Sequence, residues 1–251
     1  MEIINAVLIP ILIVTMQVSD TYLRFLAFRR KFSSTQRKNF WRGMAVTATL
    51  VFFIYVAIFQ NLVVTALIYK LILVIGWIPF FILSLKIIPL TNFQHFFILG
   101  MGVIWNLFLH SLASIIDINF FADEPHIFIL IFHAINYLIL FVIFLPIERK
   151  FFINLLPEEN FFYNQPYGKY IVLIPFLMVS GILILWVDDR LFHSWQERFS
   201  RLYLPFTFLL FYRYILTARK EIFEKQKAIR YNQHLKEQIS ALKQYNFLMQ
   251  K

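Results

Sequence analysis

Seven stretches of apolar side chains, six of them close to the length needed to cross a lipid bilayer and the seventh short, constrain this chain more than any other feature. Of its 251 residues, 60% are hydrophobic, only 15% are charged and 31 are phenylalanine. Typical soluble domains carry roughly 25% charged residues, and a soluble core of this size cannot hide so much apolar surface. A helix of about 20 apolar residues crosses a bilayer. The sequence therefore predicts an all-α fold, a polytopic membrane helical bundle.

The positions of these stretches divide the chain into two parts. We expect about seven spans in residues 1–216, a transmembrane sensor bundle, and a cytoplasmic signalling and dimerisation helix in residues 217–251. Six crossings remain an alternative if the weakest stretch is re-entrant. The predicted spans cover residues 3–18, 44–59, 67–85, 93–113, 127–145, 170–187 and 202–216.

The basic residues predict the orientation of the bundle. Residues 24–42 carry seven Arg or Lys and no acid, whereas Asp117, Asp123 and Glu124 follow the fourth stretch. With seven crossings and the N-terminus outside, twenty of the 24 basic residues fall on the inner side, as the positive-inside rule requires. The C-terminus is then cytoplasmic. We expect the basic segment to contact anionic membrane lipid and not nucleic acid.

The C-terminal 35 residues differ from the rest of the chain. They contain no glycine or proline and consist mainly of good helix formers. A seam of residues spaced four and three apart indicates a parallel coiled-coil homodimer, in which Asn246 would fix the register. The alternative is a basic amphipathic helix lying on the membrane surface. The seam residues are Leu235, Ile239, Leu242, Asn246 and Met249.

Polar side chains inside the apolar stretches are candidate ligand-binding residues. Asn106 and His110 lie one turn apart in the fourth stretch, and His133 and Asn136 share a helix face in the fifth. Polar groups at membrane depth are costly and often functional, although they also hydrogen-bond helices to one another. The two histidines lack a third metal ligand of clear spacing, so we predict no metal site.

The motifs of enzymes and of ion-coupled transporters are missing. The chain has no cysteine, no glycine-rich phosphate loop and no hydrolase motif, so we expect no cofactor and no catalytic residue in this chain. Proton or ion transport usually needs a carboxylate within a span. The candidate acids, Asp20, Asp117, Glu148 and Asp188, all lie at the end of an apolar stretch or in a predicted loop. This placement disfavours a transporter.

Three segments carry a resemblance to a known family: YLRFLAFRRKFS at 22–33, IPF at 174–176 and KEQISALKQYNFLMQK at 236–251. Together with the architecture, they resemble the membrane sensor region of AgrC-like, GHKL-type bacterial sensor histidine kinases, which act in quorum sensing. The resemblance implies that a tail of this kind leads to an Arg-His-Asp phosphoacceptor motif and an ATP-binding domain. The chain ends at Lys251 before such a motif, and His234 lacks the adjacent acid, so the phosphoacceptor role is not carried over to it.

Three hypotheses follow for the function. The first is a receptor in the bacterial plasma membrane that detects an extracellular or membrane-borne cue, a peptide or small amphiphile. It would pass the signal through a dimeric helix to a histidine kinase module of a two-component system. The second is a membrane transporter or channel-like protein with a helical assembly tail. The third is a membrane scaffold that recruits a partner by its tail.

Overall fold

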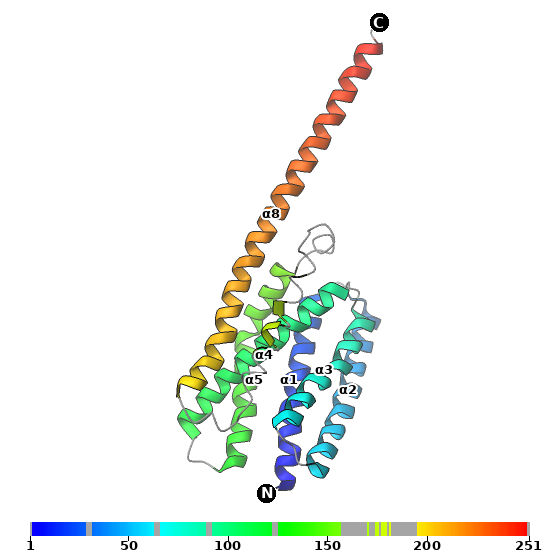
Figure 1. Ribbon diagram of the computed structural model, residues 1–251. Helices are drawn as coiled ribbons and strands as arrows, with labels where there is room; N and C mark the ends of the chain where they lie inside the picture. The colour runs from blue at the N-terminus through cyan, green and yellow to red at the C-terminus, as the bar shows by residue number, and fades with distance from the viewer. Residues whose placement is uncertain are drawn as a thin grey trace. The chain divides into compact units, whose positions relative to one another are not determined.

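The computed structural model of the chain is built from α-helices (Figure 1). It describes residues 2–28, 32–62, 66–88, 92–121, 125–156 and 195–249, together with 170, 174, 175, 177–179 and 181. Within those ranges every assigned element of secondary structure is an α-helix, which confirms the predicted all-α class. The helices are α1 (Glu2–Phe28), α2 (Ser34–Asn61), α3 (Ala66–Ile87), α4 (Asn92–Phe121), α5 (His126–Leu155) and α8 (Trp195–Met249).

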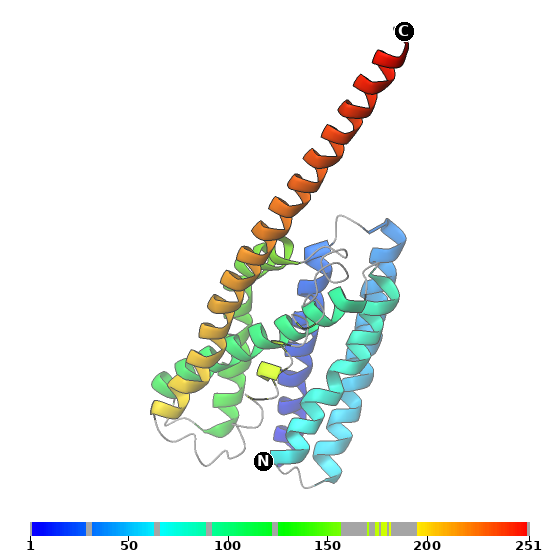
Figure 2. The same cartoon turned by 45° about the horizontal axis from the view of Figure 1, so that its top comes forward.

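The chain forms two compact units, Met1–Leu209 and Leu210–Lys251. The first unit is a helical bundle in which α1 packs against α2, α3, α4 and α5 (Figure 2). Helix α4 also packs against α3 and α5. Because α1 contacts four other helices, its side chains decide what the interior of the bundle contains.

Among the described residues, four helices are long and apolar enough to cross a membrane: Ala6–Leu26, Ser34–Asn61, Asn92–Asp117 and Ile127–Ile153. A shorter apolar helix covers Leu71–Ile87. Large apolar side chains also cover the outside of the bundle, for example Phe53 on α2, which is 62% exposed, and Val142 on α5, which is 66% exposed. An apolar exterior of this kind would be unstable in water and suits contact with lipid. The chain is therefore an integral membrane protein by composition and by surface.

Several helices continue past the ends of the predicted spans. Helix α1 runs to Phe28, which brings Asp20 and Arg24 into the bundle, and α4 runs to Phe121 and includes Asp117. Helix α5 continues through Pro146 to Leu155, although a loop was predicted to begin at this proline. These predicted boundaries are wrong, because a charged or polar side chain that finds a partner inside the bundle does not need to end a helix.

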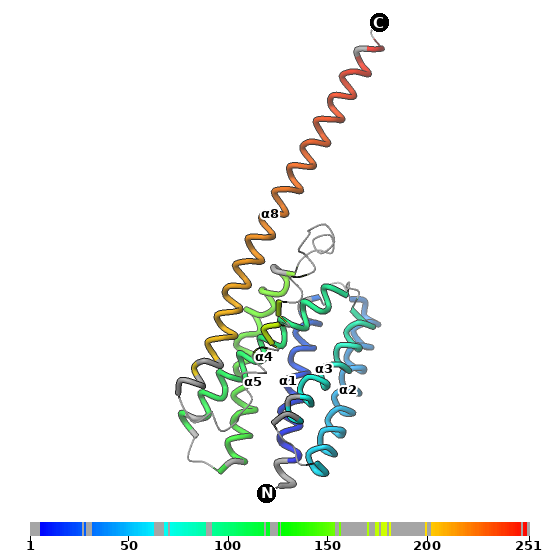
Figure 3. Tube along the Cα trace, in the orientation of Figure 1, coloured from blue at the N-terminus to red at the C-terminus, as the bar shows by residue number. Residues whose placement is uncertain are grey.

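The structure gives different information on the predicted spans at 202–216 and 170–187. Residues 202–216 lie within α8, a single helix of 55 residues whose course can be followed along the tube in Figure 3. The stretch predicted at 170–187 lies mostly outside the described residues. Seven crossings therefore stay a prediction.

The basic segment predicted as a loop is mostly helical. Ser33 caps α2: its Oγ accepts a hydrogen bond from the Gln36 backbone N–H at 3.2 Å, and the Gln36 side chain accepts one from the Ser33 N–H at 2.9 Å. This capping box starts α2 at Ser34 and leaves a short connection after α1. Arg24, which the charge count placed in this loop, is instead buried in α1.

Gly102 of α4 gives a direct test of how closely α1 and α4 approach. A Cβ atom added there would collide with the Asp20 carboxylate. We expect Gly102→Ala to lower the free energy of unfolding in detergent by about 1–3 kcal/mol, the usual cost of overpacking. Gly181→Ala is the matched control, because a Cβ at Gly181 meets open space. Equal stability of the two variants would show that α1 and α4 are further apart.

Candidate functional site

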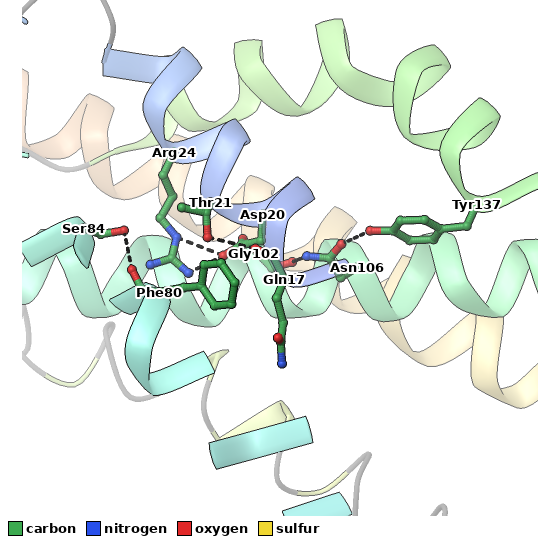
Figure 4. A network of polar contacts seen from close by, with 9 residues as sticks. All are labelled: Gln17, Asp20, Thr21, Arg24, Phe80, Ser84, Gly102, Asn106 and Tyr137. Carbon is green, nitrogen blue, oxygen red and sulfur yellow. Dashed lines mark hydrogen bonds and ion pairs between the residues drawn. The ribbon is translucent and has the colours of Figure 1, made fainter. Parts of the chain in front are cut away.

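A buried ion pair lies on α1. The Arg24 Nε donates a hydrogen bond to Asp20 Oδ2 at 2.9 Å, and Arg24 Nη2 donates to the same oxygen (Figure 4). Both residues are 1% exposed. Their spacing of four places them on one helix face, where each neutralises the charge of the other. Among the described residues no group bonds to Asp20 Oδ1 or Arg24 Nη1, so the pair retains capacity for a further partner.

One turn before Asp20, Gln17 takes part in a chain of hydrogen bonds. Gln17 Nε2 donates to the Tyr55 hydroxyl at 2.9 Å, and this hydroxyl donates to the Ile72 carbonyl at 3.2 Å. A tyrosine hydroxyl has one proton, and the carbonyl can only accept it. Tyr55 must therefore accept from Gln17, which fixes the orientation of the Gln17 amide.

Asn106 links α4 to α5. Its Nδ2 donates to the Gly102 carbonyl at 3.0 Å, and its Oδ1 accepts a hydrogen bond from the hydroxyl of Tyr137 (Figure 4). Tyr137 is fully buried and Asn106 is 4% exposed. Both polar side chains are thus satisfied within the bundle.

Glu148 of α5 is a second buried acid. It is 1% exposed, it is close enough to Asp20 to interact with it electrostatically, and no described group bonds to its Oε1. Asp20, Arg24 and Glu148 would carry one net negative charge if all three were ionised. Because an unbalanced charge is costly in an apolar bundle, these residues favour binding one proton or one other cation.

A second polar cluster joins α4 and α5. His133 Nδ1 lies 2.5 Å from Asp117 Oδ2, His133 Nε2 lies 2.8 Å from His110 Nδ1, and Asn136 Nδ2 donates to Asp117 Oδ1 at 2.6 Å. Asp117 and His133 are buried. Both oxygens of one carboxylate therefore hold side chains of the neighbouring helix.

The hydrogen bonds of this cluster define the proton positions when both histidines are neutral. The Asp117 carboxylate can only accept, so His133 carries its proton on Nδ1 and its Nε2 accepts from His110 Nδ1–H. If a proton enters at His110, the proton shared with His133 can move to Nε2 of His133. His133 then becomes an imidazolium beside Asp117. The arrangement can therefore accept a proton and pass it inward by one residue.

The structure brings three of the four candidate ligand-binding residues together. His110, His133 and Asn136 meet around Asp117, and the predicted shared face of His133 and Asn136 is observed. Asn106 lies apart from them, bonded to Tyr137, and it lines an apolar cavity that the other three do not reach. The four candidate residues therefore lie in two separate polar groups of the bundle.

Sequence reasoning missed the acids as interior residues. Asp20, Asp117 and Glu148 were predicted at the ends of apolar stretches or in loops, yet each is buried at 2% exposure or less. The i,i+4 spacing of Asp20 and Arg24, with opposite charges, is the signal that could have placed them inside α1. Asp188 lies outside the described residues. The argument against ion transport that rested on these positions is therefore overturned.

Metal binding gains no support within the described ranges, where no three His, Asp or Glu residues are grouped to hold an ion. Comparison of the chain with protein-family models, with curated proteins and with solved structures finds no match of any kind.

Asp117 can be tested by an amide substitution. An asparagine offers one oxygen and one NH₂ group, so Asn136 can keep its acceptor only if His133 changes tautomer and accepts at Nδ1, and both hydrogen bonds lose the charged acceptor. We expect Asp117→Asn to lower the free energy of unfolding by about 1–3 kcal/mol, because hydrogen bonds to a charged group are roughly twice as strong as neutral ones. The measurement is unfolding by denaturing detergent.

Glu221→Gln on the exposed face of α8 is the control for this variant, since it makes the same chemical change in solvent. If both variants unfold like the unsubstituted protein, the Asp117 carboxylate does not hold α5 to α4.

Proposed function

We propose that the chain is the membrane sensor module of a signal-transducing protein, and that α8 carries the signal out of the bundle. The observation that supports this most directly is the continuity of α8 from Trp195 to Met249. A receptor needs one element that belongs both to its sensing part and to its output part, and α8 has residues in both compact units.

The first part of α8, up to Leu209, belongs to the bundle unit. The ring of Phe206 stacks on that of Phe108 of α4, with centroids 6.0 Å apart and planes inclined by 27°. Phe108 lies two residues before His110 on the same helix. A rearrangement of the cluster around Asp117 that shifts α4 would therefore act on a helix that contacts α8.

The last part of α8 presents side chains to solvent along its length. From Thr217 to Met249 it extends for about 50 Å at 1.5 Å per residue. The exposed fractions of its apolar seam residues rise from 37% at Leu235 to 71% at Met249. An apolar stripe on a polar helix is stabilised by a second helix. This supports the parallel homodimer, with Asn246 pairing across the seam.

Orientation and family belong to the same proposal. With seven spans, the N-terminus is outside and the tail is in the cytoplasm of a bacterial cell, where it leads to a histidine kinase module. The cue, a peptide or small amphiphile, acts on the bundle and biases the packing of paired α8 helices. Such a cue can shift the equilibrium only by its different affinity for two states. The resemblance to AgrC-like sensors supports this reading of the tail.

Cysteine cross-linking tests the dimer, because the chain has no cysteine of its own. In membranes, single cysteines at Leu235, Ile239 or Leu242 should form disulfide-linked dimers, since seam residues of a parallel pair face each other. Cysteines at Glu237 and Gln244 are matched controls on the opposite face of the same helix. Equal yields at both sets, or no dimer at any seam position, would contradict the parallel pair.

The same assay separates a sensor from a scaffold. In a sensor, loosening the polar cluster with Asp117→Asn should change the yield at Leu242→Cys by about threefold or more, because coupling energies between sites are typically 1–3 kcal/mol. Glu221→Gln, which leaves the polar cluster intact, should leave the cross-linking yield at Leu242→Cys unchanged. An unchanged yield with Asp117→Asn, beside a destabilised bundle, would favour a scaffold that uses its tail only for assembly.

A second candidate function is proton-coupled transport, favoured by the buried acids Asp20 and Glu148 near Arg24. Carboxylates at membrane depth commonly mark proton pathways in transporters. The position of both acids inside the bundle removes the main sequence argument against this function.

A flux measurement distinguishes this candidate. If the bundle moves protons, liposomes containing the chain and a trapped pH-sensitive dye should lose an imposed pH gradient faster than empty liposomes. Glu148→Gln should abolish most of the difference, because the amide cannot carry the proton. Arg213→Gln, outside the buried group, is the control. No flux above that of empty liposomes would leave the sensor as the function.

A further inference from the structure

Helix α2 lies at the edge of the bundle in both views (Figures 1 and 2), and it packs against α1 and α3. It is the least buried of the four candidate membrane spans among the described residues. Two neighbouring rows of its side chains are exposed, and residues four apart in each row lie next to each other on the helix surface. We call these rows the outer strip of α2; they are Arg37, Trp41, Ala45, Thr49 and Phe53, and Lys38, Arg42, Val46, Leu50 and Ile54.

The chemistry of the outer strip changes along the helix. Its first end carries three cations, Arg37, Lys38 and Arg42, and the sequence of α2 contains no acid. Its other end exposes large apolar side chains from Val46 to Ile54, with exposed fractions of 57–62%. The two ends are about 8 Å and 12 Å long at 1.5 Å per residue. Each leaflet of a bilayer has a headgroup layer of roughly 5–8 Å outside an apolar layer of about 15 Å, so the strip matches a phospholipid in both length and polarity.

The three cations of the strip are not neutralised by the described part of the chain. No carboxylate in that part forms an ion pair with any of them. Arg24, which precedes them in the sequence, is by contrast paired with Asp20. Arg37 Nη2 donates to the Phe32 carbonyl at 3.4 Å, a contact that leaves the positive charge uncompensated. Exposed cations of this kind beside a membrane attract anionic lipid headgroups.

Trp41 lies between the cations and the apolar end of the strip, and it is 44% exposed. Its ring contacts those of Tyr22 and Phe25 on α1, with centroids 5.8 Å and 5.6 Å apart, so it is held where α1 and α2 meet. Tryptophan is enriched at the membrane–water interface, because its ring is apolar and its N–H is polar. This position indicates that the interface lies near Trp41, which places the three cations at the level of the lipid phosphates.

We infer that the outer strip of α2 binds an anionic phospholipid. The phosphate contacts the three cations, and an acyl chain lies along the apolar end from Val46 to Ile54. The charge favours an anionic over a zwitterionic headgroup, and the apolar end favours a molecule with acyl chains over a free phosphate ester. The binding needs no output from the tail, so its test is independent of the sensor function.

Quenching of tryptophan fluorescence by brominated lipid tests the strip in proteoliposomes of phosphatidylcholine. About one tenth of the lipid is replaced by phosphatidylglycerol with brominated acyl chains, or by phosphatidylcholine with the same chains as its zwitterionic match. The contribution of Trp41 is the part of the emission that Trp41→Phe removes. We expect this contribution to report an enrichment of phosphatidylglycerol of about fivefold or more, which is what one basic residue near a membrane surface provides. Equal quenching by the two brominated lipids would overturn the proposal.

Charge variants identify the residues that select the lipid. Replacing all three cations of the strip by glutamine should abolish the enrichment, while the apolar end still contacts lipid of either kind. The matched control removes the same charge from exposed positions of the tail: Lys225→Gln, Lys227→Gln and Arg230→Gln. Enrichment that survives in the strip variant, or that is lost equally in the control, would overturn the role of the strip.

Ionic strength gives a test that needs no substitution of the cations. Because exposed charges are screened beyond about 3 Å at 1 M salt, KCl at about that concentration should remove most of the enrichment, and an unchanged enrichment would show that charge does not select the lipid. Glycerol 3-phosphate at equal ionic strength should displace no more lipid than KCl does. Greater displacement would show a site for free phosphate esters and would overturn the phospholipid as the occupant.

Discussion

The pairing of Asp20 with Arg24 is the interaction on which the bundle most depends. Both side chains lie on α1, the helix that contacts α2, α3, α4 and α5, and both are buried. Removing Arg24 would leave the carboxylates of Asp20 and Glu148 without their cation, and breaking a buried ion pair in this way typically costs about 3–5 kcal/mol. With the pair intact, α1 can sit at the centre of the bundle. Gln17 and the carboxylate face of Asp20 then become available to the helices around it.

The two polar groups of the bundle differ in what they can do. The cluster around Asp117 is closed: the carboxylate uses both of its oxygens, and its histidines form a chain along which a proton can move. The group formed by Gln17, Asp20, Arg24 and Glu148 is open, because each of these side chains retains an atom that no described residue satisfies. Closed networks hold helices together, whereas open ones at membrane depth are where ligands or protons bind. Most of these unsatisfied atoms therefore lie on α1, and not on the candidate ligand-binding residues of α4 and α5.

Hydropathy predicted the number and approximate place of α1 to α5, because uninterrupted apolar runs leave few other structures in a bilayer. It failed at residues such as Asp20, Arg24 and Glu148, since a linear sum ends a span at the first charge and cannot see a partner one turn away or on another helix. The close spacing of His133 and Asn136 did predict their shared face. Asn106 and His110 have similar spacing but different partners, because Tyr137 and His133 reach α4 at different heights. The seam of the tail stays a prediction, because its contacts form only between two helices.

Gly76 and Gly102 limit which missense mutations the gene can tolerate. Each gives room to a polar group of another helix, the Tyr55 hydroxyl and the Asp20 carboxylate respectively. Any missense change of a glycine codon encodes a side chain with at least a Cβ, which at these positions would meet a buried polar atom with little space to retreat. The chain has only 6 glycines, and two of them therefore make room for polar groups of other helices. At these two positions we expect selection to tolerate no other residue, while a helix interior would otherwise favour alanine.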